Sequence, residues 1–271
     1  MVDCMKTPSS FIIDAHAHVY PEKIAAKAVH AIGAFYDLAM AGTGTSSGLI
    51  ASGAEAGVTH FIIHSAATVP EQVRPINESI ARECREHPEN FRGFGTLHPD
   101  LEDFDAEIDH MLALGLKGIK LHPDFQKFSV DDPKLDRLYD AAAGRLPILF
   151  HAGDRRYAYS NPHRIAKVVE RHPDLKVIAA HFGGFSEWQE ASRALYGLPV
   201  MFDTSSSLFE LGPQEAADMI RAAGVEKFMF GSDYPMWDHV GELKRFLALP
   251  LSDEERKAIF HDNAMRLLGL S

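Results

Sequence analysis

The 271-residue chain has few of the features that define several protein classes. Two cysteines, Cys4 and Cys84, are too few for a disulfide framework and are not spaced as a CxxC metal motif. The formal net charge is −11, and no cluster of lysine and arginine forms a basic stripe, so binding to nucleic acid is not expected. No apolar run reaches the roughly 18 residues of a membrane span, and the start of the chain lacks a signal-peptide pattern. These absences predict a cytoplasmic protein, with inert thiols, that binds neither nucleic acid nor membranes.

Histidine, by contrast, is abundant in this sequence. The chain contains 15 histidines, and imidazole is the commonest protein ligand for zinc-like metals as well as the side chain that titrates near neutral pH. Hydrophobic residues make up 46% and charged residues 24% of the chain, as in ordinary globular domains. The composition therefore predicts a normal hydrophobic core and adds a little weight to metal or acid–base chemistry.

Short apolar runs alternate with helical patterns along the chain. From the third run onward the starts lie roughly 25 to 30 residues apart, which is the length of a strand, a helix and two loops. Between runs, residues 77–87 begin with a capping residue, Asn77, and residues 162–172 begin with a proline, so both are expected to be helices. The rhythm predicts a parallel sheet with eight strands, at residues 11–16, 60–64, 91–97, 117–122, 147–151, 176–181, 199–204 and 227–232.

Eight parallel strands can close into a barrel or remain an open sheet. The usual dinucleotide-binding form of the open sheet carries a GxGxxG turn after its first strand, and this sequence has none there. A single-domain (β/α)8 TIM barrel over residues 1–271 is therefore favoured. Residues 36–53, rich in glycine, serine and threonine from residue 39 onward, are expected to form a loop or lid over the carboxyl ends of the strands.

Side chains that bind metals appear where several apolar runs end. The first run finishes as IIDAHAH, and alternation along a strand puts His16 and His18 on one face. His151 follows the apolar run of PILFHAG, His181 follows that of VIAAHFGG, and Asp233 lies just past the apolar run in FMFGSDYP. Each residue alone is readily explained as a structural histidine or a capping aspartate, but barrel enzymes build their sites at these strand ends. Their coincidence predicts a divalent metal site, since imidazoles and a carboxylate suit Zn, Mn or Fe.

These motifs resemble those of the amidohydrolase superfamily, in particular the amidohydrolase-2 group, which includes aminocarboxymuconate-semialdehyde decarboxylase and related hydrolases. The segments DAHAH, FHAG, AHFGG and FGSDYP match in type and order over almost the whole chain. The resemblance implies that His16, His18, His151 and Asp233 bind the metal. It implies that His181 positions or activates a water molecule, or binds a second metal. Zinc is the first candidate, with manganese or iron as alternatives, and one ion is favoured over two. A homodimer is expected by analogy alone.

The segment GIKLHPD leaves two interpretations open. Lys120 resembles the carboxylated lysine that bridges two metals in some amidohydrolases, but it also suits an ammonium group offered to a substrate carboxylate or a buried carboxylate. His122 alternates onto the same face as Lys120, so both are expected to line the pocket. His64 and His98 also stand at strand ends, but they fit no ligand position of the family and are expected to have supporting or structural roles.

Three functions are compatible with this set of residues. The leading hypothesis is a metal-dependent hydrolase that attacks an amide, ester or lactone carbonyl of a small molecule with metal-activated water, with His181 and Asp233 as catalytic groups. The alternative is non-oxidative decarboxylation of an unsaturated or aromatic carboxylic acid at the same site. The length of 271 residues is shorter than that of well-known decarboxylases of the group, which favours the hydrolase. A non-catalytic metal-binding protein is the third hypothesis, and an open coordination position argues against it.

Overall fold

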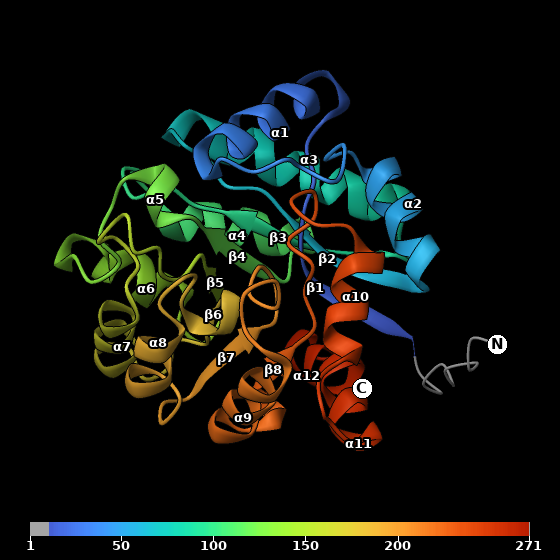
Figure 1. Cartoon of the computed structure of the whole chain (residues 1–271). Helices are drawn as coiled ribbons and strands as arrows, with labels where there is room; N and C mark the ends of the chain where they lie inside the picture. Colours follow the sequence, from blue (N-terminus) through green and yellow to red (C-terminus); the bar gives the residue numbers. More distant parts are fainter. Residues whose placement is uncertain (1–10, 271) are drawn as a thin grey trace.

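The sheet closes almost completely into a barrel. A computed structural model describes residues 11–270, in which eight parallel strands follow one another in chain order (Figure 1). The ends of the sheet also meet, because Ala15 N donates to Phe230 O at 2.8 Å and a parallel bridge joins Ala17 to Tyr234. The predicted (β/α)8 barrel is thereby confirmed. Its strands are β1 (Ile12–His18), β2 (Val58–His64), β3 (Phe91–Thr96), β4 (Gly118–Leu121), β5 (Ile148–Phe150), β6 (Val177–Ala179), β7 (Val200–Asp203) and β8 (Phe228–Met229).

Helices connect the strands and surround the sheet (Figure 1). They are α1 (Glu22–Tyr36), α2 (Ser46–Ala56), α3 (Val73–Glu86), α4 (Phe104–Ala113), α5 (Pro123–Gln126), α6 (Asp136–Ala142), α7 (Pro162–Arg171), α8 (Trp188–Ala194), α9 (Pro213–Ala223), α10 (His239–Leu247), α11 (Asp253–Lys257) and α12 (Asn263–Leu268). Short 3-10 turns lie at Pro70–Gln72, Pro133–Leu135, His181–Gly183 and Val225–Lys227, and a π-helical turn lies at Ala258–Asp262.

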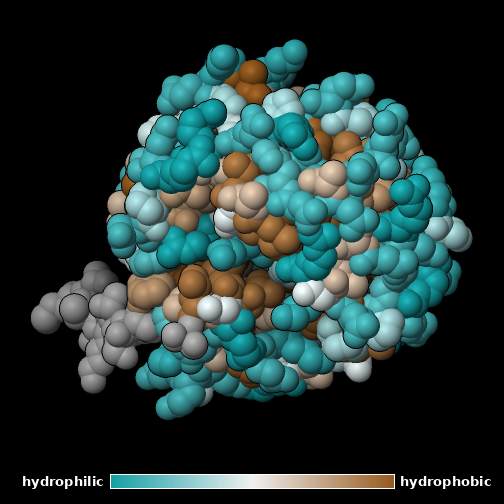
Figure 2. All heavy atoms as spheres, turned by 180° about the vertical axis from the view of Figure 1, so that it is seen from behind, coloured by the Kyte–Doolittle hydropathy of each residue, from teal (hydrophilic) through white to brown (hydrophobic). Residues whose placement is uncertain are grey.

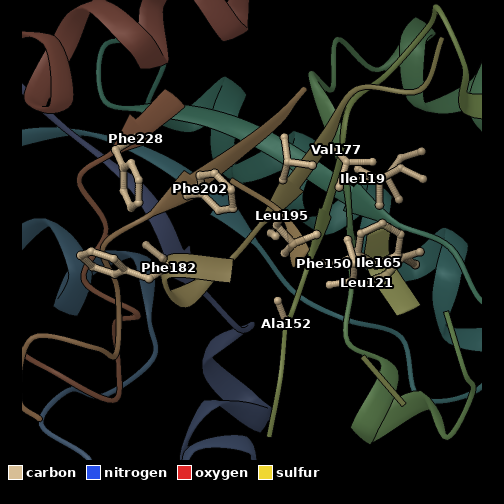
Figure 3. Close-up of a cluster of buried hydrophobic side chains, with 14 of the residues drawn as sticks. Ile119, Leu121, Phe150, Ala152, Ile165, Val177, Phe182, Leu195, Phe202 and Phe228 are labelled. Carbon is tan, nitrogen blue, oxygen red and sulfur yellow. The ribbon is translucent and has the colours of Figure 1, made fainter. Parts of the chain in front are cut away.

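Alternation along the strands divides the apolar side chains into two layers. Side chains on the outer face pack against the helices, as Phe150 does beside Ile165 of α7 and Phe202 does near Leu195 at the end of α8 (Figure 3). Side chains on the other face form a separate small cluster inside the barrel, because neighbouring residues of a strand point to opposite sides. This inner cluster includes Ile13, Ala15, Ile62, Phe94, Leu149, Ile178, Ala180 and Met229.

Part of the predicted loop over the strand ends is a helix. Residues 36–53 were expected to lack regular structure, but α1 extends to Tyr36 and α2 begins at Ser46. The Thr45 side chain caps α2 by accepting a hydrogen bond from Gly48 N at 3.1 Å, and Leu49 is fully buried under the helix. Capping and burial outweigh the low helix propensity of this Gly/Ser-rich stretch. Only residues 37–45 remain irregular.

The helix predicted at residues 77–87 begins four residues earlier than expected. Asn77 is not its N-cap but a buried residue inside α3. Its side chain accepts from Thr96 N at 2.7 Å and donates to Thr96 O at 3.1 Å and to Glu107 Oε1 at 2.9 Å. A buried amide that satisfies strand and helix partners is stabilising where it stands, so the capping signal was misread. The helix predicted from Pro162 is confirmed as α7.

The cysteines carry no sign of reactivity where they are described. Cys84 lies on α3, and burial raises the pKa of its thiol to about 12, which keeps the thiol protonated at neutral pH. The prediction for Cys4 lies outside the described residues.

The surface is mostly polar. Seen from behind, hydrophilic residues predominate, and apolar residues are gathered towards the middle of that face (Figure 2). The large apolar side chains that are exposed include Phe11, Ile24 and Val240, which belong to separate elements. None of the helices within residues 11–270 has the length and apolar character that a membrane crossing requires.

Glu242 on α10 predicts a pH dependence of stability. Its carboxylate is 1% exposed and pairs with Arg245, yet burial raises its pKa to about 7. Between about pH 4.5 and 7 the folded state therefore binds more protons than the unfolded state, and stability falls as the pH rises through this window. We expect the Glu242→Gln variant to lose this decline and to gain on the order of 1 to 3 kcal/mol over the wild type at pH 8.

Denaturant unfolding of both proteins at several pH values measures this difference. Equal slopes for the two proteins between pH 5 and 7.5 would show that Glu242 ionises normally.

Candidate metal centre

The candidate site lies next to the inner core of the barrel, at the carboxyl ends of the strands. Ile62, Leu149 and Met201 face inwards, and alternation puts the residue two positions later on the same side. The polar residues at these later positions are His64, His151 and Asp203, which are all buried. The strands thus carry apolar residues into the barrel and polar residues to its carboxyl end, where barrel enzymes build their sites.

His16, His18 and Asp233 converge on one point. The Nε2 atoms of His16 and His18 each lie 3.4 Å from Asp233 Oδ1. Two ligand atoms about 2.1 Å from one ion lie about 3.4 Å apart at a tetrahedral angle, so this spacing fits a shared zinc-like cation. Asp233 Oδ2 is held separately, since it accepts from Ser206 Oγ at 2.5 Å. The three side chains meet as the sequence predicted.

Asp203 orients His16 and was missed by the sequence analysis. His16 Nδ1 lies 2.8 Å from Asp203 Oδ2, and a carboxylate accepts rather than donates, so Nδ1 carries the proton and Nε2 presents a lone pair. Asp203 Oδ1 accepts from His181 N at 3.0 Å, from Ser205 N at 3.1 Å and from Ser205 Oγ. This carboxylate–histidine arrangement is typical of metal ligands, whose second nitrogen is fixed by an acceptor.

His151 and His181 face one another at the same end of the barrel. His151 Nδ1 lies 3.0 Å from His181 Nε2, and His151 Nε2 lies 3.3 Å from Asp124 Oδ2. His181 Nδ1 contacts Ser205 O at 3.2 Å and Ser205 Oγ at 2.9 Å. The ring of His181 is 5.0 Å from that of His16 and 4.9 Å from that of His151. His181 therefore stands between the His16 cluster and His151.

Lys120 and His122 occupy different places around the site. Lys120 is fully buried, and its Nζ lies 3.2 Å from His16 Nε2. His122 stacks on Phe125, with ring centroids 3.7 Å apart, and on His151 at 4.1 Å. Tyr36 Oη lies 3.2 Å from His122 Nε2. Both residues face inwards as expected, but only His122 belongs to the wall of the cavity described below.

Burial sets the charge state of these side chains. It lowers the pKa of His16, His18, His151 and His181, so the imidazoles are neutral at pH 7, which is the form that binds metals. Burial also lowers the pKa of Lys120 to about 8, against the opposing effect of nearby carboxylates. Burial alone would raise the pKa of Asp233. The surrounding histidines have the larger opposite effect and hold this pKa below its usual range. The cluster thus combines neutral imidazoles with an ionised carboxylate.

Unusual backbone conformations hold two of these residues. Asp233 and His181 have φ values of 60° and 59°, a region that side chains with a Cβ seldom occupy. Asp233 N donates to His16 O at 2.9 Å, which ties this turn to β1. The neighbouring Gly231 permits the close approach, because a Cβ there would lie 3.0 Å from His16 Cβ.

A small enclosed cavity opens beside the cluster, and most of its wall is apolar or aromatic. Its volume is about 20 Å³, which is room for about one water molecule. The wall consists of His16, His18, Ile32, Tyr36, Met40, His122, Phe125, His151, His181, Asp233, Pro235 and Met236.

Potential ligand atoms approach within 4.8 Å of one another in three groups of residues between 11 and 270. Two groups share His16, one with His18 and His64 and the other with His181 and Asp203. The third lies apart at the end of α3 and consists of Glu83, Glu86 and His87. His18 Nδ1 and His151 Nε2 are buried without a hydrogen-bond partner in the same part of the chain. The buried donor set thus fits a divalent cation, with His151 joined to it through His181.

Asp203→Asn should weaken metal binding while leaving every proposed ligand in place. The amide cannot accept from His16 Nδ1 as a carboxylate does and allows the wrong imidazole tautomer. We expect the affinity for zinc or manganese to fall by about 10 to 100-fold, measured by competition with a chromophoric chelator. An affinity within twofold of that of the wild type would contradict the role of Asp203.

Known proteins resemble this chain in sequence and in fold. The family model described as Amidohydrolase matches residues 13–270. Gamma-resorcylate decarboxylase of Rhodococcus jostii is 23% identical over 265 residues, covering 74% of this chain and 79% of the relative. A TIM-barrel protein of Bordetella bronchiseptica has a TM-score of 0.78, 22% identity and coverage of 96% and 99%. A dihydroxybenzoic acid decarboxylase of Polaromonas, solved with manganese and 2-nitroresorcinol, has a TM-score of 0.73, 17% identity and coverage of 96% and 97%.

Proposed function

The chain belongs to the amidohydrolase family and is a metal-dependent enzyme of its superfamily, and from this premise we propose that it decarboxylates a small aromatic carboxylic acid without oxidation. The sequence alone favoured a hydrolase, on the ground of chain length. The relatives outweigh that argument, since the curated relative quoted above is named as a decarboxylase of an aromatic acid. A hydrolase is supported only at the level of the superfamily.

The observation that carries the proposal is the meeting of a metal-binding cluster with an aromatic wall. Asp233 and the two histidines of β1 lie on one side of the cavity, and the stacked rings of His122 and Phe125 lie on another. Stacked flat rings favour a planar ligand, because offset aromatic contacts add to the gain from apolar burial. A larger, mostly apolar pocket shares His18, Ile32, His122 and Phe125 with this wall, and it offers space for such an acid beside the cluster.

We assign the metal to His16, His18 and Asp233, with His151 as the fourth ligand. Their nitrogens and the Oδ1 atom of Asp233 form the buried donor set. When bound, the divalent ion supplies a positive charge that attracts and orients the substrate carboxylate. Manganese is the first ion to test, because a neighbour of the same fold contains it; zinc and iron suit the same ligands.

The chain's own acid–base group is His181. Its Nδ1–H donates to Ser205 O, which leaves Nε2 to take up and deliver a proton. Because burial lowers its pKa, His181 rests as a neutral imidazole. Nε2 first takes up a proton from solvent, and the resulting imidazolium gives that proton up readily. The proton adds to the ring carbon that bears the carboxylate. The carbon–carboxylate bond then breaks, its electron pair returns to the ring, and carbon dioxide leaves. His181 is then neutral again, and it takes its next proton from solvent.

Hydrolysis of an amide, ester or lactone stays a second candidate because of one feature of the site. His181 lines the cavity beside the cluster, where its imidazole would equally accept a proton from an attacking water. Lys120 suits either of two roles, a carboxylated bridge between two metals or an ammonium group that binds a carboxylate. Its contact with His16 Nε2 suits a bridge between two metals, and its pKa of about 8 leaves much of it as ammonium at pH 7.

A matched pair of compounds distinguishes the two reactions. The manganese-loaded enzyme is incubated in D2O with a series of hydroxybenzoic acids and, separately, with their methyl esters. We expect labelled carbon dioxide from the carboxyl-labelled acids and deuterium at the vacated ring carbon, while the esters remain intact. Released methanol with unchanged acids would overturn the decarboxylase and support the hydrolase.

A His181→Gln variant serves as the control for enzyme-catalysed turnover. It should retain its metal and lose activity by about 100-fold or more, as is typical for removal of a general acid. Full activity in this variant would contradict the role proposed for His181.

A further inference from the structure

His64 is a buried histidine with no partner. It ends β2, is fully buried, and neither of its ring nitrogens has a hydrogen-bond partner among residues 11–270. Leaving a buried polar group unpaired costs about 1 to 3 kcal/mol. The residue therefore requires an explanation that the family pattern does not give.

The register of the barrel points His64 at the metal cluster. β2 pairs with β1 so that His64 stands opposite His18, and Ile62, two residues earlier, belongs to the inner core. The ring of His64 lies edge-on to those of His16 and His18, with centroids 4.8 Å and 4.4 Å away. One potential ligand atom from each of these three histidines lies within 4.8 Å of the other two.

The surroundings of His64 do not suit an ion pair. Burial lowers its pKa well below the ordinary value, and the neighbouring His18, His16 and Lys120 lower it further. The side chain is therefore a neutral imidazole with one free lone pair. A neutral, desolvated imidazole beside two others is the form that binds a borderline divalent cation.

We propose that His64 is an additional ligand of the divalent cation held by His16, His18 and Asp233. This inference rests on the proposed metal site and extends it to β2. The unpaired nitrogen then has a partner whenever the ion is bound, and the site gains a third imidazole from the β1–β2 side of the barrel. One coordination position fewer is left for water or substrate than in a site without His64.

The test uses cobalt(II) in the full-length protein. Visible d–d absorption of cobalt(II) strengthens as its coordination number falls, and competition with a chelator gives the affinity. We expect His64→Phe and His64→Asn to weaken cobalt and zinc affinity by about tenfold or more and to intensify the absorption. His98→Asn is the matched control, because His98 is buried at the end of the next strand and accepts from Asp100 N. It should change neither property.

The outcomes separate this inference from the proposed site. Unchanged affinity and spectrum in a folded His64 variant, with metal lost from His16→Ala, would overturn the role of His64 and keep the site. Metal retained by His16→Ala would overturn the site itself. If His64→Phe does not fold, His64→Asn decides, since the smaller side chain does not overpack the buried position. If neither folds, X-ray absorption of the wild-type zinc protein decides. The inference predicts four bound imidazoles, from His16, His18, His151 and His64, and three or fewer would contradict it.

Discussion

Replacing His16 with alanine is expected to remove the bound divalent ion and to lower turnover by about a thousandfold or more, because the charge that orients the substrate is worth several kcal/mol. His16 provides Nε2 to the cluster and shares Asp233 Oδ1 with His18. Metal content by plasma mass spectrometry and turnover of the acid substrate measure the two effects. Circular dichroism establishes that the barrel still forms.

His163→Ala is the matched control for this prediction. His163 is an exposed histidine on α7 that pairs with Glu190 at 3.4 Å. Its removal should change neither metal content nor turnover, since exposed ion pairs contribute little. A His16→Ala protein that keeps a full equivalent of metal would contradict the assignment of His16.

Replacing Asp14 with alanine is expected to lower the free energy of unfolding by about 3 to 5 kcal/mol, as removal of one member of a buried ionic network does. Asp14 is fully buried, and its Oδ1 accepts from His16 N at 2.9 Å and from Ser232 N at 3.0 Å. Its Oδ2 accepts from Ser232 Oγ at 2.5 Å and lies 3.0 Å from His239 Nε2. These contacts join β1 to the segment after β8 and to α10.

Chemical denaturation of the wild type, Asp14→Ala and Asp253→Ala measures this effect. The Asp253 side chain is 96% exposed, so its loss should change stability by less than about 0.5 kcal/mol. A similarly small change in Asp14→Ala would mean that barrel closure does not depend on Asp14.

The strands were predictable because buried parallel strands are nearly continuous apolar runs. FIID, ILFH and VIAAH each gave a strand within a few residues of its observed bounds. The strand β8 is short, with two residues, because the chain turns away at Gly231 and brings Asp233 to the site. The helix α2 was missed, since its stability comes from a cap and from burial rather than from helix-forming residues.

The site was predictable only where ligands recur at strand ends. His16, His18 and Asp233 stand at such positions, and the fold brings them together. Asp203 was missed although it also ends an apolar run, VMFD, because a single aspartate there carries no local signal of a partner 187 residues away. Asp14 was missed for the same reason, since it belongs to the DAHAH motif but contacts residues far along the chain.

The structure also changes how the ligand set is understood. His151 was expected to share the ion with His16 and His18, but its close ring contacts are with His122 and His181, at 4.1 and 4.9 Å. His64, which the family pattern left without a role, lies closer to the pair from β1. Sequence spacing indicates which strands carry imidazoles, but the twist of the barrel decides which of them meet. The expected homodimer stays a prediction.

The measurement that tests the site most directly is anomalous diffraction from crystals of the manganese-loaded protein. The account predicts one strong peak in the barrel, about 2.0 to 2.3 Å from His16 Nε2, His18 Nε2 and Asp233 Oδ1. An empty position there, or a peak only at the Glu83, Glu86 and His87 group on α3, would contradict it.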